Sequence, residues 1–490
     1  MENKIRRKEE IFGFFAAVLA GRLPDRYKPL IFSSPVCARD ASSGQIWHPC
    51  FINSNLFIKI IKTIPEIIYA FIIGAIKITI QYKPSYIVQI GQHHDILIVA
   101  TNQIVAKGAT NTLRTPYLNI VDESKVDWLI LNYGSKSESF NFKKFSISRI
   151  QMLKIDWGLF KESFGAFIYC LGVSKDKFIL TEAFLLFSVW ALRQGWVSAF
   201  ALEEILKKLN AQYKYKIFFS PHEMHPYSRA LWFWSKKFGL KSVALQHAVI
   251  HRNKLLFFPT QEERLAGLAT PDIFYIFSQK YLPLLKPYMP DTRFIIGSSP
   301  RFSNRINLEE LFNDKDKELL IITSTCWFDI RSMLSLAGRL LNGSCAQKKI
   351  TVRLHPYGNY AMADFFKIQF LKWIKRVNFS AQTLKQDLEK SWMVLGCGSS
   401  VIFEAMLCGI PTVLVSDARF ANFELEGLFI DNIMNGRTDF VNWEFLNDIA
   451  GRSNLGRLQE ESQDLLGIKN TKVDSAVIND LQNERAAHHE

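Results

Sequence analysis

The feature that most constrains the fold is an alternation of two patterns along the chain from about residue 86 onward. Short apolar runs of strand length are separated by stretches in which apolar residues recur with helical spacing, of which 178–210 is the clearest. Strands that alternate with helices form parallel sheets with helices on both faces, so the sequence predicts an α/β protein. The expected strands are 95–101, 126–133, 215–221, 241–247, 273–278, 293–299, 318–325, 349–356, 392–398 and 411–417.

The length of the chain predicts two domains. Its 490 residues exceed what one hydrophobic core normally serves, and a polar, broken segment at 300–317 is the expected boundary. We predict two Rossmann-like domains with parallel sheets, an N-terminal one over 1–310 and a C-terminal one over 311–450, followed by a helix and tail over 451–490. Ligands bind at the carboxyl ends of parallel strands, and we expect the strand ends of both domains to face one central cleft.

The charge and cysteine content narrow the class of partner. A net charge of +14 favours an anionic partner, such as a phosphate-bearing substrate or an anionic membrane, although solvated lysines account for part of the excess. No RNA- or DNA-binding signature is visible, so we expect no nucleic-acid partner. None of the seven cysteines forms a C-x-x-C pair, which argues against a disulfide framework or zinc site and favours reduced thiols in the cytoplasm.

One segment resembles a membrane helix without meeting the requirement for one. Within 64–82, Glu66 and Lys77 leave only about ten uninterrupted apolar residues, short of the roughly 20 that a spanning helix needs. We expect a buried helix within 51–85, and as the alternative a helix on the inner face of the cytoplasmic membrane. The N-terminus lacks a convincing cleavage site, so we do not expect a signal peptide.

A glycine- and serine-rich junction within 395–417 is the first candidate site. Gly396 and Gly398 permit a sharp turn after an apolar strand, and Ser399 and Ser400 then open a helix. The unpaired N–H groups and positive dipole of a helix start suit a phosphate. Glu404 follows one turn later, where a carboxylate can bind ribose hydroxyls. The alternative is plain N-capping by Ser399, with Glu404 as a first-turn charge.

A second candidate follows the strand at 349–356. Arg353 and His355 are two residues apart, so both point to one face, and Pro356 stops the strand there. An arginine and a histidine at a strand end suit a phosphate or a pyrimidine. The alternative is a histidine in a solvent-facing loop.

A third candidate lies in the turn after the strand at 215–221. This turn holds His222, Glu223 and His225, and Arg229 lies just inside the next helix. A carboxylate beside imidazoles can serve as general base for a hydroxyl, which points to Glu223, while Arg229 can hold an anion. The spacing of the two histidines raises the question of a metal, but no further ligand is visible nearby, so we expect none.

Two further strand ends carry polar groups. Gln246 and His247 end the strand at 241–247, and the loop after them is rich in hydrogen-bond donors. Small residues from Gly297 onward lead to Arg301 after the strand at 293–299.

In this order, these elements resemble GT-B glycosyltransferases of bacterial surface-carbohydrate synthesis, over roughly residues 215–415. The capsule and lipopolysaccharide enzymes, which include Kdo, sialic acid and polyglycerol-phosphate transferases, share a strand ending in His-Pro and a later serine-rich helix start. A narrower set shares a glutamate turn, a Q-H loop and a G-x-x-R strand end; here Ala248 follows the Q-H step and one extra small residue precedes the arginine. The matching residues are His355-Pro356, Gly398-Ser399-Ser400, Glu404-Ala405, Gly409-Ile410-Pro411, Glu223, Arg229-Ala230, Gln246-His247, Phe258-Pro259 and Gly297 through Arg301.

The resemblance implies a metal-independent transfer of a sugar from a nucleotide donor, often a cytidine nucleotide, to a glycan or lipid-linked acceptor, with no cofactor. It places the donor in the C-terminal domain and the acceptor on the N-terminal side. Two other readings stay open: a sugar-nucleotide epimerase of the same fold, and a non-catalytic peripheral scaffold of a polysaccharide assembly complex. The assignments are Glu223 and His247 to catalysis; Arg301, Arg353, His355, Gly398, Ser399, Ser400 and Glu404 to the donor; and His225, Arg229 and Gln246 to the acceptor.

Overall fold

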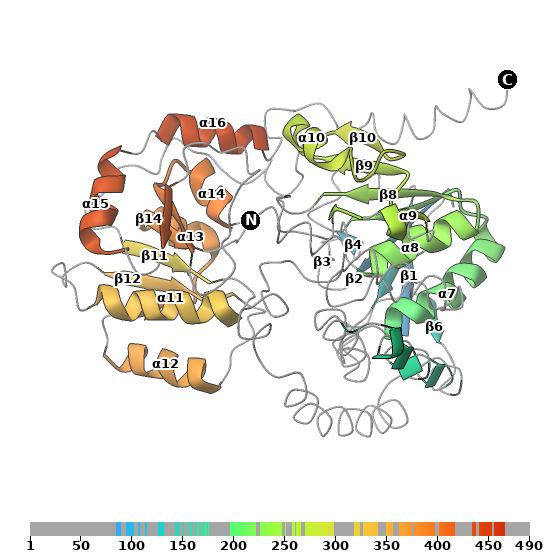
Figure 1. Ribbon diagram of the computed structural model, residues 1–490, viewed down its shortest axis with the longest axis horizontal. Helices are drawn as coiled ribbons and strands as arrows, with labels where there is room; N and C mark the ends of the chain where they lie inside the picture. Colours follow the sequence, from blue (N-terminus) through green and yellow to red (C-terminus); the bar gives the residue numbers. More distant parts are fainter. Residues whose placement is uncertain are drawn as a thin grey trace.

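The fold was analysed in a computed structural model (Figure 1). Up to residue 175 the structure describes six short strands, residues 95, 126 and 175, and scattered helical positions between 150 and 173. The later described ranges are 197–221, 226–246, 250, 257–259, 261–265, 270–297, 318–323, 327–341, 349–355, 362–374, 377–396, 401–416, 434–437, 441–452 and 455–465.

The first domain is built on an eight-stranded sheet with the order β10-β9-β8-β7-β2-β5-β1-β6. The strands from β10 to β5 are parallel, whereas β1 runs antiparallel to both β5 and β6. The strands are β1 (Ser85–Gln89), β2 (Ile96–Thr101), β5 (Asp127–Leu131), β6 (Lys143–Ser146), β7 (Ile217–Ser220), β8 (Lys241–Leu245), β9 (Ile273–Ile276) and β10 (Arg293–Ile296).

The second domain is built on a six-stranded sheet that is parallel throughout, with the order β13-β12-β11-β14-β15-β16. In Figure 1 this sheet and its helices form the orange and red body, and the green body is the first domain. The strands are β11 (Glu318–Ile322), β12 (Ile350–Arg353), β13 (Val377–Phe379), β14 (Ser391–Gly396), β15 (Thr412–Ser416) and β16 (Met434–Arg437).

Helices flank both sheets (Figure 1). In the second domain, α16 lies over α14 and extends toward the first domain, where Lys280 Nζ of the 3-10 helix η5 is 2.9 Å from Asp464 Oδ2. The helices are α7 (Val197–Tyr213), α8 (Pro226–Lys237), α9 (Gln261–Leu265), η5 (Gln279–Tyr281), α10 (Leu282–Leu285), α11 (Trp327–Leu340), α12 (Met362–Trp373), α13 (Leu384–Glu389), α14 (Val401–Leu407), α15 (Trp443–Arg452) and α16 (Leu455–Leu465); a small hairpin pairs β3 (Ala106–Lys107) with β4 (Leu113–Arg114).

The cores explain why the strands read as continuous apolar runs. Successive strand side chains point to opposite faces, and both faces of a parallel sheet are covered. In β11, Leu319 and Ile321 pack in the cluster that includes α11, whereas Leu320 and Ile322 pack on the other face with Ala405 of α14. All four leucine and isoleucine side chains are buried.

The predicted α/β class with two Rossmann-like sheets is confirmed. The antiparallel pair β1 and β6 at one edge of the first sheet was not predicted, and neither was the short strand β13. The predicted boundary at 310–311 and residues 51–84 of the segment 51–85 lie outside the described residues, as does the part of the predicted helix 178–210 before residue 197. Across the part of the chain that the structure describes, no helix has the length and apolar character needed to cross a membrane.

Candidate functional site

The carboxyl edge of the second sheet brings two of the predicted candidate regions to either side of β11. The register places Ile322 of β11 between Arg353 of β12 and Gly396 of β14, so these three residues form one row across neighbouring strands. Thr323 and His355 lie immediately beyond this row. The strand ends that the sequence singled out separately are therefore neighbours in space.

Thr323 fixes the backbone at His355. Its hydroxyl oxygen accepts a 2.8 Å hydrogen bond from the backbone N–H of His355, and its own backbone N–H donates to the carbonyl of Arg353. Thr323 is fully buried, whereas His355 is half-buried. The hydroxyl thus continues the pairing of β11 and β12 past their last ladder bonds and sets the place at which His355 leaves the sheet.

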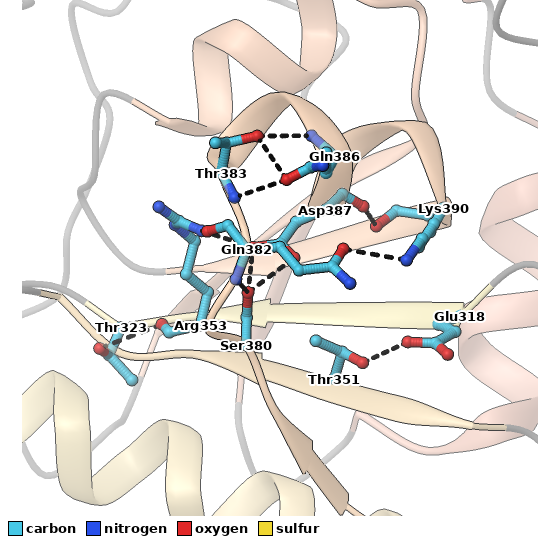
Figure 2. Close-up of polar contacts among 11 residues, drawn as sticks. Glu318, Thr323, Thr351, Arg353, Ser380, Gln382, Thr383, Gln386, Asp387 and Lys390 are labelled. Atoms are coloured by element: carbon cyan, nitrogen blue, oxygen red, sulfur yellow. Dashed lines mark hydrogen bonds and ion pairs between the residues drawn. The ribbon is translucent and has the colours of Figure 1, made fainter.

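Arg353 is held by an ion pair within its own domain (Figure 2). Its Nη1 lies 2.5 Å from Asp387 Oδ2 and donates to the carbonyl of Gln382 at 2.9 Å. The Ser380 hydroxyl also contacts the Asp387 carboxylate, at 2.7 and 2.6 Å from its two oxygens. The carboxylate side chain is 4% exposed and the arginine side chain 25% exposed. This arrangement gives Arg353 a structural role, and any contact with a ligand would use its other N–H groups.

The helix that carries Asp387 begins with a capping box (Figure 2). Thr383 Oγ1 accepts from the backbone N–H of Gln386, and the Gln386 side chain accepts from the backbone N–H of Thr383. Such a box satisfies two N–H groups that the first turn leaves unpaired. The box sets where α13 begins, and therefore where Asp387 meets Arg353.

Gly396 ends β14 in a crowded place. A Cβ atom built on it would lie 3.3 Å from two side-chain carbons of Ile402 and 3.5 Å from the carbonyl oxygen of Ile322. The absence of a side chain therefore lets α14 pack close to the end of the sheet. This packing is a different reason for a glycine from the sharp turn that the sequence predicted.

Glu404, for which the sequence predicted a contact with ribose hydroxyls, has a buried side chain. It lies on α14 and is 4% exposed. Burial, together with the nearby Glu404 and Glu389 carboxylates, raises the pKa of the Cys408 thiol to about 12. Cys408 is therefore a neutral, buried thiol at physiological pH, as expected of a reduced cysteine in a core.

In the first domain, a buried hydrogen bond joins two residues that lie on either side of Glu223 in the sequence. The hydroxyls of Ser220, at the end of β7, and Ser228, in the first turn of α8, are 2.6 Å apart. Both residues are fully buried, and the adjacent Arg229 is 3% exposed. The bond ties the end of β7 to the first turn of α8.

Gln246 links two strand ends in the same sheet. Its backbone N–H donates to the carbonyl of Tyr275, and its side-chain oxygen accepts a 2.8 Å bond from the backbone N–H of Phe277. Gln246 is fully buried. The predicted acceptor-side residue is thus a structural tie between β8 and β9.

Of the predicted site residues, Arg229, Gln246, Arg353, His355 and Glu404 are described. The structure brings Arg353 and His355 together at one sheet edge and places Arg229 and Gln246 in the other domain. No group of three His, Cys, Asp or Glu side chains suited to a metal ion occurs among the described residues. The predicted residues outside the described ranges are His222, Glu223, His225, His247, Arg301, Gly398, Ser399 and Ser400.

Sequence reasoning missed Thr323, Ser380 and Asp387. Thr323 directly follows a buried apolar run, as the predicted strand-end residues do, so the same rule would have found it. Asp387 gave a weaker signal, because only the T-x-x-Q pattern of a capping box marks its helix.

Comparison with known proteins gives similarity to solved structures alone. No family model matches the sequence, and no curated protein matches it. The UDP-GlcNAc 2-epimerase of Methanocaldococcus jannaschii, in complex with UDP-GlcNAc and UDP, is 12% identical with a TM-score of 0.44, over 79% of this chain and 99% of that chain. S. aureus MnaA in a co-structure with UDP is 10% identical to this chain with a TM-score of 0.45, over 77% of this chain and 93% of that chain. Acinetobacter baumannii MurG is 11% identical to this chain with a TM-score of 0.37, over 80% of this chain and 99% of that chain.

Proposed function

We propose that the protein is a glycosyltransferase of the GT-B type that takes its sugar from a nucleotide donor. Enzymes of this class consist of two Rossmann-like domains. The observation that carries the proposal is the row at the carboxyl edge of the second sheet, where the end of β14 at Gly396 and the strand end before His355 flank Thr323. Ligands of parallel α/β sheets bind at this edge.

The donor would occupy this edge. The half-buried His355 and the serines that follow Gly398 would contact the nucleotide, with Glu404 near the ribose and Arg301 reaching across from the first domain. The chain's positive charge supports a donor with an acidic sugar, and we propose a CMP-linked one. The acceptor would be a glycan or lipid-linked glycan of a surface polysaccharide.

Transfer would begin with deprotonation of the acceptor hydroxyl. We assign this step to Glu223, assisted by His247, because a carboxylate can accept the proton of a hydroxyl. In the sequence Glu223 lies between Ser220 of β7 and Ser228 of α8, whose hydroxyls are 2.6 Å apart. The sugar would then bond to the acceptor oxygen while its bond to the nucleotide phosphate breaks. Cations and N–H groups at the donor edge would stabilise the negative charge on the departing nucleotide. No metal or cofactor is part of the proposal.

The first test is thermal stabilisation by CMP, CDP, UDP, GDP and ADP, each at about 1 mM. A ligand at about 100 times its Kd stabilises a protein by about 2.7 kcal/mol. We expect a selective response to CMP that is lost in Ser399→Ala/Ser400→Ala. Ser335→Ala on α11 is the matched control and should keep it. A response to no nucleotide contradicts the proposal.

The second test addresses catalysis. Glu223→Gln should abolish sugar transfer while the response to nucleotide is retained. Retained turnover removes Glu223 from the mechanism. Conversion of the nucleotide sugar without any acceptor would show an epimerase in place of a transferase.

A further inference from the structure

The outer face of α12 is aromatic and exposed. Phe365, Phe366, Phe370 and Trp373 are 55%, 64%, 57% and 77% exposed, and we call these four residues the aromatic face. The opposite side of the helix, with Ile368 and Leu371, is packed in the core of the second domain. In Figure 1, α12 is the outermost helix on its side of the second domain.

The spacing of the aromatic face forms a continuous stripe. Phe366, Phe370 and Trp373 are separated by four and three residues, which places them on successive turns of one helix face. Single exposed apolar residues are ordinary on a protein surface, but a contiguous patch marks a contact with another apolar phase.

The charges of α12 are positive toward solvent. Its one acidic residue, Asp364, is buried and lies 3.1 Å from Arg331 Nε, so it does not face outward. Lys372 is exposed, with its amine 5.5 Å from the centre of the Phe379 ring, and Lys367 is half-buried with its amine bonded to the Ser335 hydroxyl. The surface therefore combines aromatic rings with cations, as do helices that lie in the interface of an anionic membrane.

A second exposed face of similar character belongs to the first domain. The described residues between 150 and 173 are helical. Trp157 and Phe164 are 59% and 44% exposed, and Lys154 and Lys161 are exposed beside them. In Figure 1 the teal helical pieces lie, like α12, toward the lower side of the molecule.

We propose that the aromatic face of α12 is a docking surface for an anionic lipid bilayer. The rings of Phe366, Phe370 and Trp373 enter the headgroup boundary, where aromatic side chains are enriched, and the lysines contact lipid phosphates. Charge complementarity favours an anionic bilayer over a second copy of the chain. A second copy would bring Lys367 and Lys372 of each chain close together, and each chain carries a net charge of +14. This inference goes beyond the proposed function and does not depend on it.

The test measures co-sedimentation of the full chain with vesicles of phosphatidylcholine alone and of phosphatidylcholine with phosphatidylglycerol at about 3:1. We expect binding to the anionic vesicles that weakens at high salt. Phe366→Ser/Phe370→Ser/Trp373→Ser should lower partitioning about tenfold or more. Leu265→Ser on α9, which changes a residue that is 79% exposed elsewhere on the molecule, is the matched control and should bind as the unchanged protein does.

The outcomes separate the possible occupants. Loss of binding in the triple variant alone, with an unchanged unfolding transition, supports the lipid surface. Equal binding of neutral and anionic vesicles, no binding at all, or full binding by the triple variant overturns it. A concentration-dependent dimer that the triple variant abolishes, without vesicle binding, would assign the face to a second copy. The nucleotide response is measured without vesicles, so failure of the proposed function is seen separately.

Discussion

The carboxyl edges of the two sheets are built by the same device but to different extents. In each, one side chain at a strand end accepts a 2.8 Å bond from the backbone N–H beyond the neighbouring strand: Gln246 from Phe277 in the first sheet, and Thr323 from His355 in the second. The second edge adds the ion pair between Arg353 and Asp387.

The two edges differ in how deeply the residues of each hydrogen-bonded tie are buried. Gln246 and Phe277 are both buried, so the first tie lies inside the core. At the second edge the hydrogen bond to Thr323 comes from His355, which is half-buried. The ion pair between Arg353 and Asp387 lies at the same edge, and its carboxylate is buried. A rigid base under a partly exposed residue suits a ligand site, because its geometry is set before the ligand arrives.

The largest expected effect is loss of the charged anchor. Asp387→Ala leaves the Arg353 guanidinium without the carboxylate that balances it in a partly buried place. Removal of one partner from a buried ion pair costs about 3–5 kcal/mol, and the partial exposure of Arg353 favours the lower value. Urea unfolding measures the loss, and hydrogen exchange should locate it in β12 and β13.

A matched control lies on the same helix. Lys385 is 77% exposed and pairs with Glu389 at 3.7 Å, so Lys385→Ala should cost less than about 0.5 kcal/mol. If both variants lose the same small amount, the charged anchor adds nothing and the two edges are equivalent.

Sequence reasoning found the sheets because buried parallel strands leave a direct record. β11 and β14 each read as an unbroken apolar run, since both of their faces are covered. β13 left no such record, because it has three residues and Asn378 in its centre is exposed. The sequence of β1 also does not show that this strand pairs antiparallel, because its residue pattern is compatible with both parallel and antiparallel sheets.

At the candidate site, the sequence showed where Arg353 lies in the fold but not which residue it contacts. Arg353 was placed at a strand end, which is where the structure has it, but its partner Asp387 follows 34 residues later on another element. Nothing in the local pattern pairs these two residues, since the contact exists only once β12 and α13 are packed. For the same reason the sequence did not show that the side chain of Gln246, which was predicted to contact the acceptor, accepts a hydrogen bond from the backbone N–H of Phe277.

The second expected effect concerns the tie inside the first edge. Gln246→Met leaves the Phe277 N–H without the acceptor that Gln246 supplies, in a fully buried place. An unsatisfied buried donor costs about 1–3 kcal/mol. Thermal unfolding should show this loss, and the same change at the exposed Gln212 on α7 should show almost none. Equal stability of the two variants would mean that the tie adds nothing.

The third expected effect is smaller because His355, at the other tie, is half-buried. Thr323→Val keeps the shape of the side chain and removes the acceptor for the His355 N–H. We expect a loss of about 0.5–1.5 kcal/mol, with a reduced nucleotide response under the proposed function. Thr323→Ser keeps the hydroxyl and should restore most of both quantities. A loss greater than that of Gln246→Met would reverse the comparison of the two edges.

The smallest expected effect concerns the link between the domains that carry these edges. Lys280 of η5 and Asp464 of α16 are 2.9 Å apart, with side chains 32% and 48% exposed. A double-mutant cycle with Lys280→Ala and Asp464→Ala should give about 0.2–1 kcal/mol, reduced further by salt. The pair Arg457–Glu461 within α16, at 3.3 Å, is the reference for an ion pair that joins no domains. Similar values for both pairs would mean that the ion pair does not fix one edge against the other. A value well above about 1 kcal/mol for Lys280–Asp464 would mean that the link couples the edges, and changes at the second edge should then alter hydrogen exchange at the first.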